Sequence, residues 1–260
     1  MIADSMSTNA KRRFMQTRLQ LRFCLFLVAA AAFRPASFGT AEALSSGYRV
    51  DLPCQPSTLL TEFFDGVTPP ALPSGWSSTT WMTSDSGSPM PPADTPPNAV
   101  FVDDPATITD KQLLSPTITL ACDAGAVDVS FRNNFNFQDG FDGGVLEVSY
   151  DGGLTFQDVL AVGGMFVRGG YNGTINSCCG NPLAGRQAWT GNSAGFIDTT
   201  VVSLPGGCII LNQFIVRWRM GSDSSVSGEG WRIDTVDISE CNRPPRRHPE
   251  PRPRPSPTPR

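Results

Sequence analysis

The chain of 260 residues is 17% charged and 40% hydrophobic, which is too apolar for a wholly disordered protein and lacks the periodic Glu, Lys and Ala of a coiled coil. Basic residues gather at the two ends, which leaves residues 44–242 with 8 basic and 21 acidic residues, a net charge of −13. This negative charge of residues 44–242 argues against binding to nucleic acid and suits the binding of hard cations.

Residues 1–43 predict a secretory signal peptide. Basic residues at positions 11–22 precede the apolar run 24–33, and Ala41-Glu42-Ala43 supplies the small residues that a signal peptidase requires. The apolar run is about half as long as the ~20 residues of a membrane-spanning helix. We therefore predict cleavage near Ala43, export from the cell, and no insertion into a membrane.

Apolar residues recur with a period of two in the body of the chain. The pattern is clear at residues 127–131, 143–150, 214–220 and 231–233, and clusters of Gly, Asp, Asn and Pro separate these runs. No window of a dozen residues carries the 3.6-residue period of an amphipathic helix. The sequence predicts an all-β fold, an antiparallel sandwich or barrel.

An even number of cysteines remains in the chain after the predicted cleavage. An even number favours disulfides over free thiols in an exported chain. If the first and last strands are antiparallel neighbours, Cys54 could bond to Cys241. Cys122 could then join Cys208, which leaves two adjacent cysteines to each other. In the alternative, the adjacent pair bonds to two different partners. The six cysteines are Cys54, Cys122, Cys178, Cys179, Cys208 and Cys241.

The residues available for catalysis are few. The single histidine, His248, lies in the Pro- and Arg-rich C-terminal stretch, so catalytic arrangements that need an imidazole fixed in the fold are excluded. We therefore predict no catalytic residue. The remaining enzymatic alternative is a glycoside hydrolase with two carboxylates, for which Glu147 and Glu229 are candidates.

Two acidic turns stand beside predicted strands. Ser149-Tyr-Asp151-Gly-Gly-Leu-Thr155-Phe156 resembles an Asp-box, in which Asp and Thr side chains bond the backbone of a hairpin turn. Asp139-Gly-Phe-Asp142-Gly-Gly is either a second hairpin turn or a source of oxygen ligands for calcium, although its spacing does not fit an EF-hand.

The last strand predicts a β-bulge. Trp231 and Ile233 are out of step with Val236 and Ile238 by one residue, and a bulge at Asp234-Thr235 would restore the phase. If the first strand pairs with this one, several carboxylates come together. We predict that they hold a structural calcium ion, with solvated acidic turns as the alternative; the candidate ligands are Glu62, Asp65, Asp104, Asp234 and Asp237.

The alternation of apolar and polar residues is absent between Gly163 and Gly195, a stretch that contains nine glycines. A long loop on a rigid sandwich is where binding residues usually lie. Its aromatic and polar side chains suit stacking on a sugar ring or contact with a protein. We predict ligand contacts by Tyr171, Arg186, Trp189 and Asn192, with a place in the core as the alternative for Trp189.

Five short motifs occur in a characteristic order: Glu62-Phe-Phe-Asp65-Gly, Leu114-Ser-Pro116, Phe141-Asp-Gly-Gly-Val-Leu-Glu147, Asn181-Pro-Leu-Ala-Gly-Arg-Gln-Ala-Trp189-Thr-Gly and Gly230-Trp-Arg-Ile-Asp234. In this order they resemble the MAM-like jelly-roll module of secreted bacterial proteins, as attached to immune-inhibitor-type metalloproteases. The resemblance covers nearly all of residues 55–242. It implies a jelly-roll β-sandwich over 44–242 with an extracellular, non-catalytic adhesion or targeting role, often with structural calcium, and it favours Glu62, Asp65 and Asp234 as ligands.

Residues 243–260 contain eight prolines and six arginines and predict a disordered, polyproline-like tail. Together the patterns predict an exported, disulfide-linked module that binds an extracellular glycan or protein surface. A glycoside hydrolase and a purely structural spacer or partner-docking domain are the alternatives.

Overall fold

A computed structural model describes residues 55–122, 124–207 and 212–242. The predicted signal peptide with its cleavage near Ala43, the tail 243–260, and Cys54 and Cys208 lie outside the described residues. The described residues form β-strands and turns, and none of them belongs to a helix that is long and apolar enough to cross a membrane.

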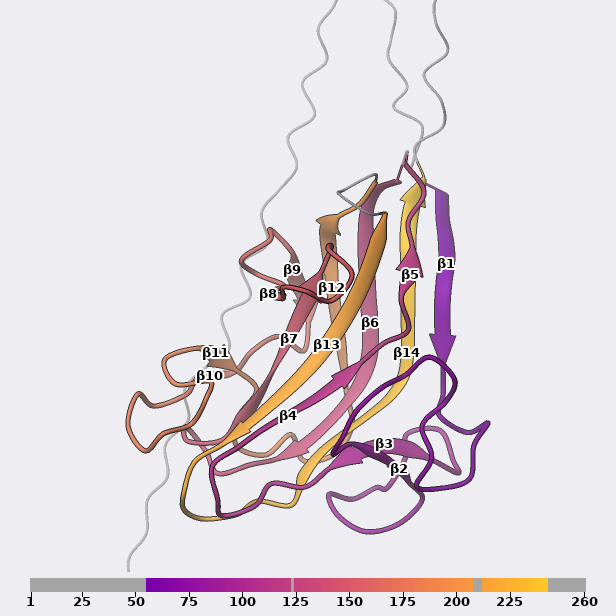
Figure 1. Ribbon diagram of the computed structural model, residues 1–260. Coiled ribbons are helices and arrows are strands. Elements are labelled where there is room, and N and C mark those ends of the chain that lie inside the picture. Colours follow the sequence, from indigo (N-terminus) through magenta and orange to yellow (C-terminus); the bar gives the residue numbers. More distant parts are fainter. Residues whose placement is uncertain (1–54, 123, 208–211, 243–260) are drawn as a thin grey trace, which may run out of the picture. The chain divides into compact units, whose positions relative to one another are not determined.

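Two antiparallel sheets face each other (Figure 1). The first has the order β2 (Met82–Ser84), β3 (Ala99–Val102), β14 (Gly230–Asn242), β6 (Ala124–Asn136), β12 (Ile197–Pro205) and β9 (Met165–Arg168), with β1 (Gln55–Glu62) also on β14. The second has the order β4 (Thr109–Leu114), β13 (Gln213–Ser222), β7 (Gly143–Ser149) and β8 (Gln157–Asp158), with β5 (Ile118–Thr119) also on β13. A small hairpin joins β10 (Gly173–Thr174) and β11 (Gln187–Ala188). The predicted antiparallel jelly-roll β-sandwich is confirmed.

The predicted alternation places large apolar side chains between the sheets. On β13 the residues Phe214, Val216, Trp218 and Met220 are all 0% exposed. Because side chains alternate across a strand, Arg217 and Arg219 then point to the opposite, outer face of the sheet.

All five tryptophans of the chain lie in this core, none more than 6% exposed. The ring of Trp231 lies 5.2 Å from Trp81 and 5.7 Å from Trp189, measured between centroids. Phe131 stands edge-on between Trp189 at 5.8 Å and Trp218 at 5.5 Å. The rings form one continuous row, so no tryptophan is left on the surface to stack on a ligand.

The first and last strands pair antiparallel, as predicted, with Leu60 opposite Ile238. The pairing of β14 with β6 shifts register between Asp234 and Asp237, and Thr235 has a φ of 48°. This is the predicted β-bulge, and it keeps the apolar residues on both sides of it in the core.

The structure also places a disulfide between Cys178 and Cys179. Cys122 and Cys241 are each disulfide-bonded as well.

Strand β7 departs from the predicted alternation because all seven of its residues are buried. Outward-facing Val145 forms a small apolar cluster with Ile175, Leu183 and Ala188, which belong to the irregular segment 171–190. A strand that is covered on both faces does not alternate between apolar and polar residues. The sequence pattern therefore predicts the face that points into the core but not the cover on the outer face.

Gly144 of β7 lies directly against a tryptophan of the row. A Cβ atom at this position would stand 2.3 Å from Cζ3 of Trp231, a distance that real Cβ atoms essentially never show. The absence of a side chain here is what lets the two sheets approach.

We expect Gly144→Ala to lower the free energy of unfolding by about 1–3 kcal/mol, because the added methyl group forces the buried indole of Trp231 to move. Chemical denaturation followed by tryptophan fluorescence measures the change. Gly66→Ala is the control, since a Cβ at Gly66 would have no atom within 4 Å. Equal stability of the two variants would contradict this account of the close approach.

Candidate binding surface

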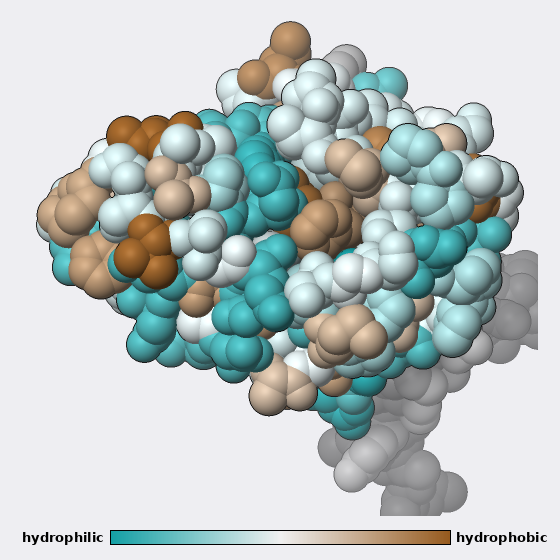
Figure 2. All heavy atoms as spheres, turned by 90° about the horizontal axis from the view of Figure 1, so that it is seen from below, coloured by the Kyte–Doolittle hydropathy of each residue, from teal (hydrophilic) through white to brown (hydrophobic). Residues whose placement is uncertain are grey.

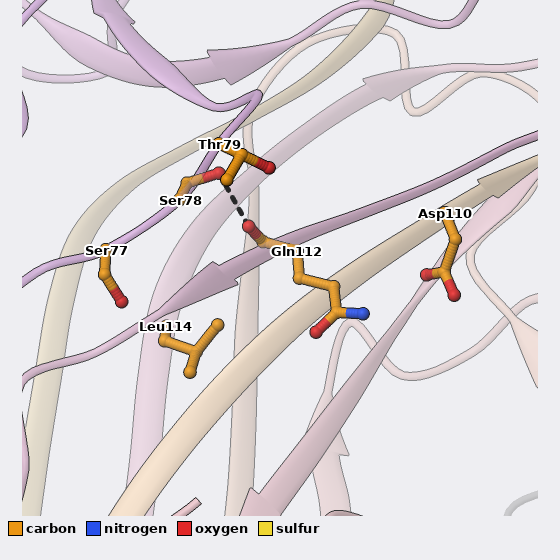
Figure 3. Close-up of a pocket in the computed structure, with 6 residues that line it drawn as sticks. All are labelled: Ser77, Ser78, Thr79, Asp110, Gln112 and Leu114. Atoms are coloured by element: carbon orange, nitrogen blue, oxygen red, sulfur yellow. Dashed lines mark hydrogen bonds between the residues drawn. The ribbon is translucent and has the colours of Figure 1, made fainter.

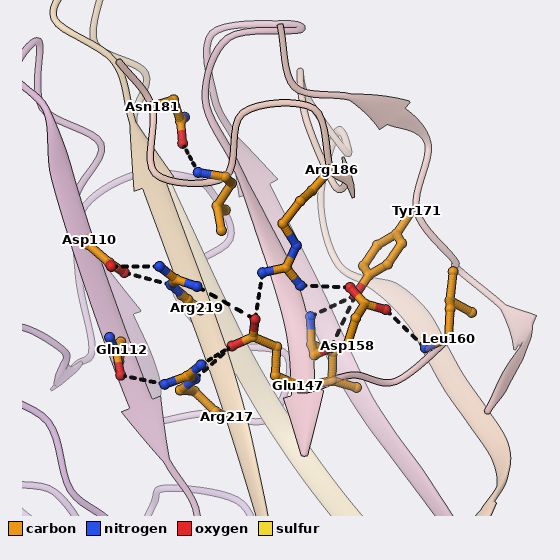
Figure 4. A network of polar contacts seen from close by, with 12 residues as sticks. Asp110, Gln112, Glu147, Asp158, Leu160, Tyr171, Asn181, Arg186, Arg217 and Arg219 are labelled. Carbon is orange, nitrogen blue, oxygen red and sulfur yellow. Dashed lines mark hydrogen bonds and ion pairs between the residues drawn. The ribbon is translucent and has the colours of Figure 1, made fainter. Parts of the chain in front are cut away.

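Polar side chains from four strands share the outer face of the second sheet. Arg217 of β13 lies opposite Glu147 of β7, which in turn lies opposite Asp158 of β8. Arg219 lies opposite Gln112 of β4. Directly opposed residues in antiparallel strands point to the same face. We call this row the polar strip (Figure 4); it consists of Asp110, Gln112, Glu147, Asp158, Arg186, Arg217 and Arg219.

Glu147 is the centre of the polar strip, and only 4% of its side chain is exposed. Its Oε1 accepts a hydrogen bond from Arg186 Nη1 at 2.5 Å, and its Oε2 accepts one from Arg217 Nε at 2.7 Å. Arg219 Nη1 lies 3.7 Å from Oε1. Three guanidinium groups therefore surround one buried carboxylate.

Each arginine also binds a second acceptor away from the centre. Arg219 donates two hydrogen bonds of 2.8 Å to Asp110, and these bonds lower the pKa of Asp110. Arg217 Nη1 donates to the Gln112 amide oxygen at 3.1 Å. Arg186 Nη2 donates to Asp158 Oδ2 at 2.8 Å. The polar strip thus contains three carboxylates and three guanidinium groups, and its charges balance.

The Asp-box turn between β7 and β8 positions one side of the polar strip. The Asp151 carboxylate accepts hydrogen bonds from the Thr155 amide at 2.9 Å, the Thr155 hydroxyl at 2.5 Å and the Ser149 hydroxyl at 2.7 Å. These bonds, those from Thr155 above all, lower the pKa of Asp151 to about 2. The predicted role as a structural turn is confirmed. The turn brings the Phe156 ring to 3.9 Å from the Arg217 guanidinium carbon, a cation–π contact.

A hollow lies at each end of the polar strip. The first, of 430 Å³, lies beside β4 and is shown in Figure 3; it is lined by Ser77, Ser78, Thr79, Asp110, Gln112 and Leu114. Ser77 is held there by paired backbone hydrogen bonds with Leu114, and the Ser78 hydroxyl donates to the Gln112 carbonyl at 2.7 Å. The second hollow, of 280 Å³, lies beside β8 and is lined by Asp158, Leu160, Ala161, Tyr171, Arg186 and Gln187.

The four predicted ligand contacts come from one segment but do not gather in one place. Arg186 and Tyr171 reach the polar strip, where the Tyr171 hydroxyl lies 3.1 Å from Asp158 Oδ2. Burial, together with the charge of Asp158, raises the pKa of Tyr171 well above its usual value.

The prediction that Trp189 contacts a ligand is corrected by its position in the core. Its side chain is 0% exposed, and its indole nitrogen donates to the Gly169 carbonyl at 2.8 Å. Asn192 is exposed but lies opposite Asn136 of the other sheet, where its Oδ1 accepts a hydrogen bond from the Ala194 amide at 2.6 Å. It lines neither hollow.

The structure does not bring the five predicted calcium ligands together. Glu62 accepts from the Phe64 amide, and Asp65 accepts from the Asn98 amide. Asp237 accepts from the Thr61 hydroxyl. Each of these three carboxylates thus anchors local backbone or a neighbouring strand instead of facing the others.

Asp234 and Asp104 likewise accept hydrogen bonds from backbone amides of their own. Asp234 lies at the bulge and accepts from the amides of Asp94 and Thr95 at 2.8 and 2.9 Å, while Asp104 accepts from the Gly228 amide at 2.9 Å. Across residues 55–122, 124–207 and 212–242, no three acidic, histidine or cysteine side chains converge closely enough to hold a metal ion.

Glu147 and Glu229, the carboxylates considered for glycoside hydrolysis, do not form a pair. Glu147 lies on the outer face of the second sheet, whereas Glu229 precedes β14 of the first sheet and accepts a hydrogen bond from Asn136 at 2.9 Å. Because the two residues belong to different sheets, they do not form the facing pair of carboxylates that glycoside hydrolysis requires.

Most members of the polar strip were not predicted as site residues. Arg217 and Arg219 are two of the eight basic residues in 44–242, and they stand two positions apart on one strand. That spacing places both on one face and is the sequence signal that could have indicated the polar strip.

No protein-family profile matches the sequence, and a search of curated proteins finds no match either. Solved structures that align with part of the chain include TmCBM61 in complex with β-1,4-galactotriose, with a TM-score of 0.39 and 14% identity over 64% of this chain and 88% of that one. They also include the K2 cleaved adhesin domain of Lys-gingipain, with a TM-score of 0.39 and 19% identity over 69% and 96% of the two chains. A third is the CBM22-1 xylan-binding domain of Paenibacillus barcinonensis Xyn10C, with a TM-score of 0.41 and 9% identity over 74% and 99%.

We expect Glu147→Ala to lower the free energy of unfolding by about 2–4 kcal/mol, because it leaves three partly buried arginines without their shared counter-ion. Denaturant unfolding measures the change. Asp198→Ala is the control: it removes an ion pair with Arg132 whose carboxylate side chain is 55% exposed, and it should cost about 1 kcal/mol or less. A Glu147 variant as stable as the control would show that the polar strip is not a cooperative network.

Proposed function

We propose that this chain is an exported, non-catalytic binding module whose polar strip binds the hydroxyl groups of an extracellular glycan. The observation that carries the proposal is the row of planar carboxylate, guanidinium and amide groups across β4, β13, β7 and β8, with a hollow at each end. Planar groups with two adjacent donors or acceptors suit pairs of neighbouring hydroxyls.

The charge balance of the polar strip favours a neutral ligand. Each guanidinium already binds a carboxylate, so an anionic polymer would find no unpaired positive charge, and the surrounding body is strongly acidic. Sugar hydroxyls can instead donate to the outer lone pairs of Asp110 and Gln112 and accept from the remaining N–H groups of the arginines.

Two features support binding without catalysis. The body contains no histidine, and the carboxylate at the centre of the polar strip has both oxygen atoms engaged by arginine. Such a carboxylate is held as a structural counter-ion instead of standing ready to move a proton. Export is supported by the basic and apolar N-terminal pattern with its small-residue cleavage sequence.

The polar strip is rigid, which suits a binding surface. Its side chains are held by cross-strand pairs and by the Phe156 ring beneath Arg217. Groups that are already ordered lose little conformational entropy when a ligand binds.

We expect the purified protein to be retained by at least one neutral polysaccharide, and Gln112→Ala to weaken that retention about 5- to 10-fold, since one well-placed hydrogen bond contributes about 1 kcal/mol. Affinity electrophoresis against a polysaccharide panel measures the effect. Ser130→Ala, on the outer face of the other sheet, is the matched control and should leave retention unchanged.

The same panel decides between the alternatives when reducing-end release is followed. If the protein releases sugar products and Glu147→Gln abolishes that release, the chain is a glycoside hydrolase and not a binding module. Absence of retention on every polysaccharide, together with capture of a defined extracellular protein, would favour a partner-docking domain and overturn the glycan proposal.

A further inference from the structure

The segment 176–181 meets the outer face of the second sheet at one end of the polar strip. Asn181 Nδ2 donates to the Gly221 carbonyl oxygen of β13 at 2.9 Å. A Cβ atom at Gly221 would stand 2.5 Å from Asn181 Oδ1, so the Asn181 side chain occupies the space above this glycine. Gly221 lies opposite Asp110 and two positions beyond Arg219, and residues so related share one face of a sheet. The segment therefore adjoins these two members of the polar strip.

An exposed group of apolar side chains lies at this point. Ile108 is 54% exposed and stands two residues before Asp110, and Cys178 and Cys179 are exposed as well. A Cβ atom at Gly180 would lie only 2.7 Å from Ile108 Cδ1, so Ile108 contacts the residue that follows the two cysteines. We call these four residues the apolar patch. Seen from below, hydrophobic residues gather on the lobe at the left, the side on which β10 and β11 lie in Figure 1 (Figure 2).

The disulfide between Cys178 and Cys179 determines the shape of the apolar patch. Cys179 has a φ of 72° and Gly180 a φ of 85°, a left-handed conformation that residues other than glycine seldom adopt. A cross-link between neighbouring residues closes a loop too short to restrict the unfolded chain much, so it adds little to the stability of the whole fold. Its effect is local, because it holds two exposed sulfur atoms and the turn of the backbone in one arrangement.

Both ends of this turn are anchored independently of the disulfide. The Asn176 amide donates to the Gly140 carbonyl oxygen at 2.8 Å, and Asn181 Nδ2 donates to the Phe141 carbonyl oxygen at 2.7 Å. These bonds attach the turn to the loop before β7. The apolar patch is thus held in place before a ligand binds, and little conformational entropy is lost on binding.

The polar strip by itself offers a ligand hydrogen bonds and charges but little apolar surface. Each hydrogen bond replaces one with water and has a net contribution of about 1 kcal/mol. Binding sites gain further free energy from the burial of apolar surface. A pyranose ring has C–H groups on its faces, but all five tryptophans of the chain lie in the core. The apolar patch provides such a surface beside Asp110 and Arg219.

The size of the apolar patch favours a sugar ring over a protein as its ligand. A stable protein–protein interface buries roughly 1,200–2,000 Å², far more than one isoleucine and two cysteines can cover. The patch carries no charge, and the charges of the polar strip beside it balance. Both features suit a small, neutral ring that exchanges hydrogen bonds at its edge.

We propose that the apolar patch packs against the C–H face of a neutral pyranose ring while Asp110 and Arg219 bind hydroxyl groups at the edge of the same ring. The side chains of Asp110 and Arg219 are 35% and 21% exposed, so both are accessible to a ligand. Sulfur is polarizable and suits close contact with C–H groups. The assignment rests on the proposed function and adds to it the surface that contacts the face of the sugar.

The first test replaces the isoleucine. With a neutral polysaccharide that retains the wild-type protein, Ile108→Ala should weaken retention about 3- to 10-fold, because it removes most of the apolar side chain that the ring covers. Affinity electrophoresis measures the change. Met165→Ala is the matched control, since Met165 is 56% exposed and lies on β9 of the first sheet, and it should be retained as well as the wild-type protein.

The second test removes the disulfide. Cys178→Ser combined with Cys179→Ser should weaken retention by about threefold or more, because the turn no longer holds its shape. The midpoint of thermal unfolding should stay within about 2 °C of the wild-type value, because the cross-link hardly restricts the unfolded chain. A loss of binding without a loss of stability is the result that a purely structural disulfide would not give.

Failure of this assignment and failure of the proposed function give different results. If Gln112→Ala weakens retention while Ile108→Ala and the double cysteine variant do not, the polar strip binds the glycan and the apolar patch takes no part. If no polysaccharide retains the wild-type protein, the proposed function is wrong and the apolar patch is not a sugar subsite. Capture of a defined extracellular protein that Ile108→Ala abolishes would make the patch a protein contact.

The stability of the double cysteine variant is interpreted separately. A midpoint lowered by more than about 5 °C would show that the disulfide stabilises the fold as a whole, contrary to the account above. The retention of Ile108→Ala, compared with that of Met165→Ala, then decides the assignment by itself.

Discussion

The fold and the polar strip depend on the insertion of one indole from an irregular segment into the core. Trp189 contacts Phe131 and Trp231 across the sandwich, and Phe166 and Tyr171 beside it. Its backbone exchanges two hydrogen bonds of 2.9 Å with Gly144 of β7. The segment is thereby attached to the second sheet through both side chain and backbone, and such a contact removes much of the freedom of a long loop.

That attachment is what brings Arg186 to Glu147. Arg186 precedes Trp189 by three residues and lies in a turn closed by hydrogen bonds to Ile175 and Leu183. Because its backbone is fixed, the guanidinium can bridge Glu147 and Asp158 at the outer face, while Arg217 and Arg219 approach from β13. A core contact thus determines the geometry of a surface, and the surface charges are paired before any ligand arrives.

Two of the buried carboxylate groups among the described residues differ in how their charge is balanced. Glu147 is enclosed by three guanidinium groups, so its site is complete without further ions. Asp104 and Asp142 accept hydrogen bonds from backbone amides, and their carboxyl groups lie within hydrogen-bonding reach of each other. The first arrangement pairs charge with charge, whereas the second relies on backbone amides and on the contact between the two carboxyl groups. Both lie on or at the ends of β4, β7 and β13, so the rigidity of these strands serves both.

The sequence by itself determined the strands, their inner faces, the bulge at Asp234 and Thr235, and the Asp-box turn, because each depends on local periodicity or on side chains a few residues apart. It did not determine that Trp189 turns inward, that β7 is covered on both faces, or which carboxylates meet. Alternation shows which side of a strand a residue occupies but not what lies against that side. Glu147 with Arg186, and Asp104 with Asp142, come together only because strands and loops distant in the chain become neighbours when the two sheets close on one another.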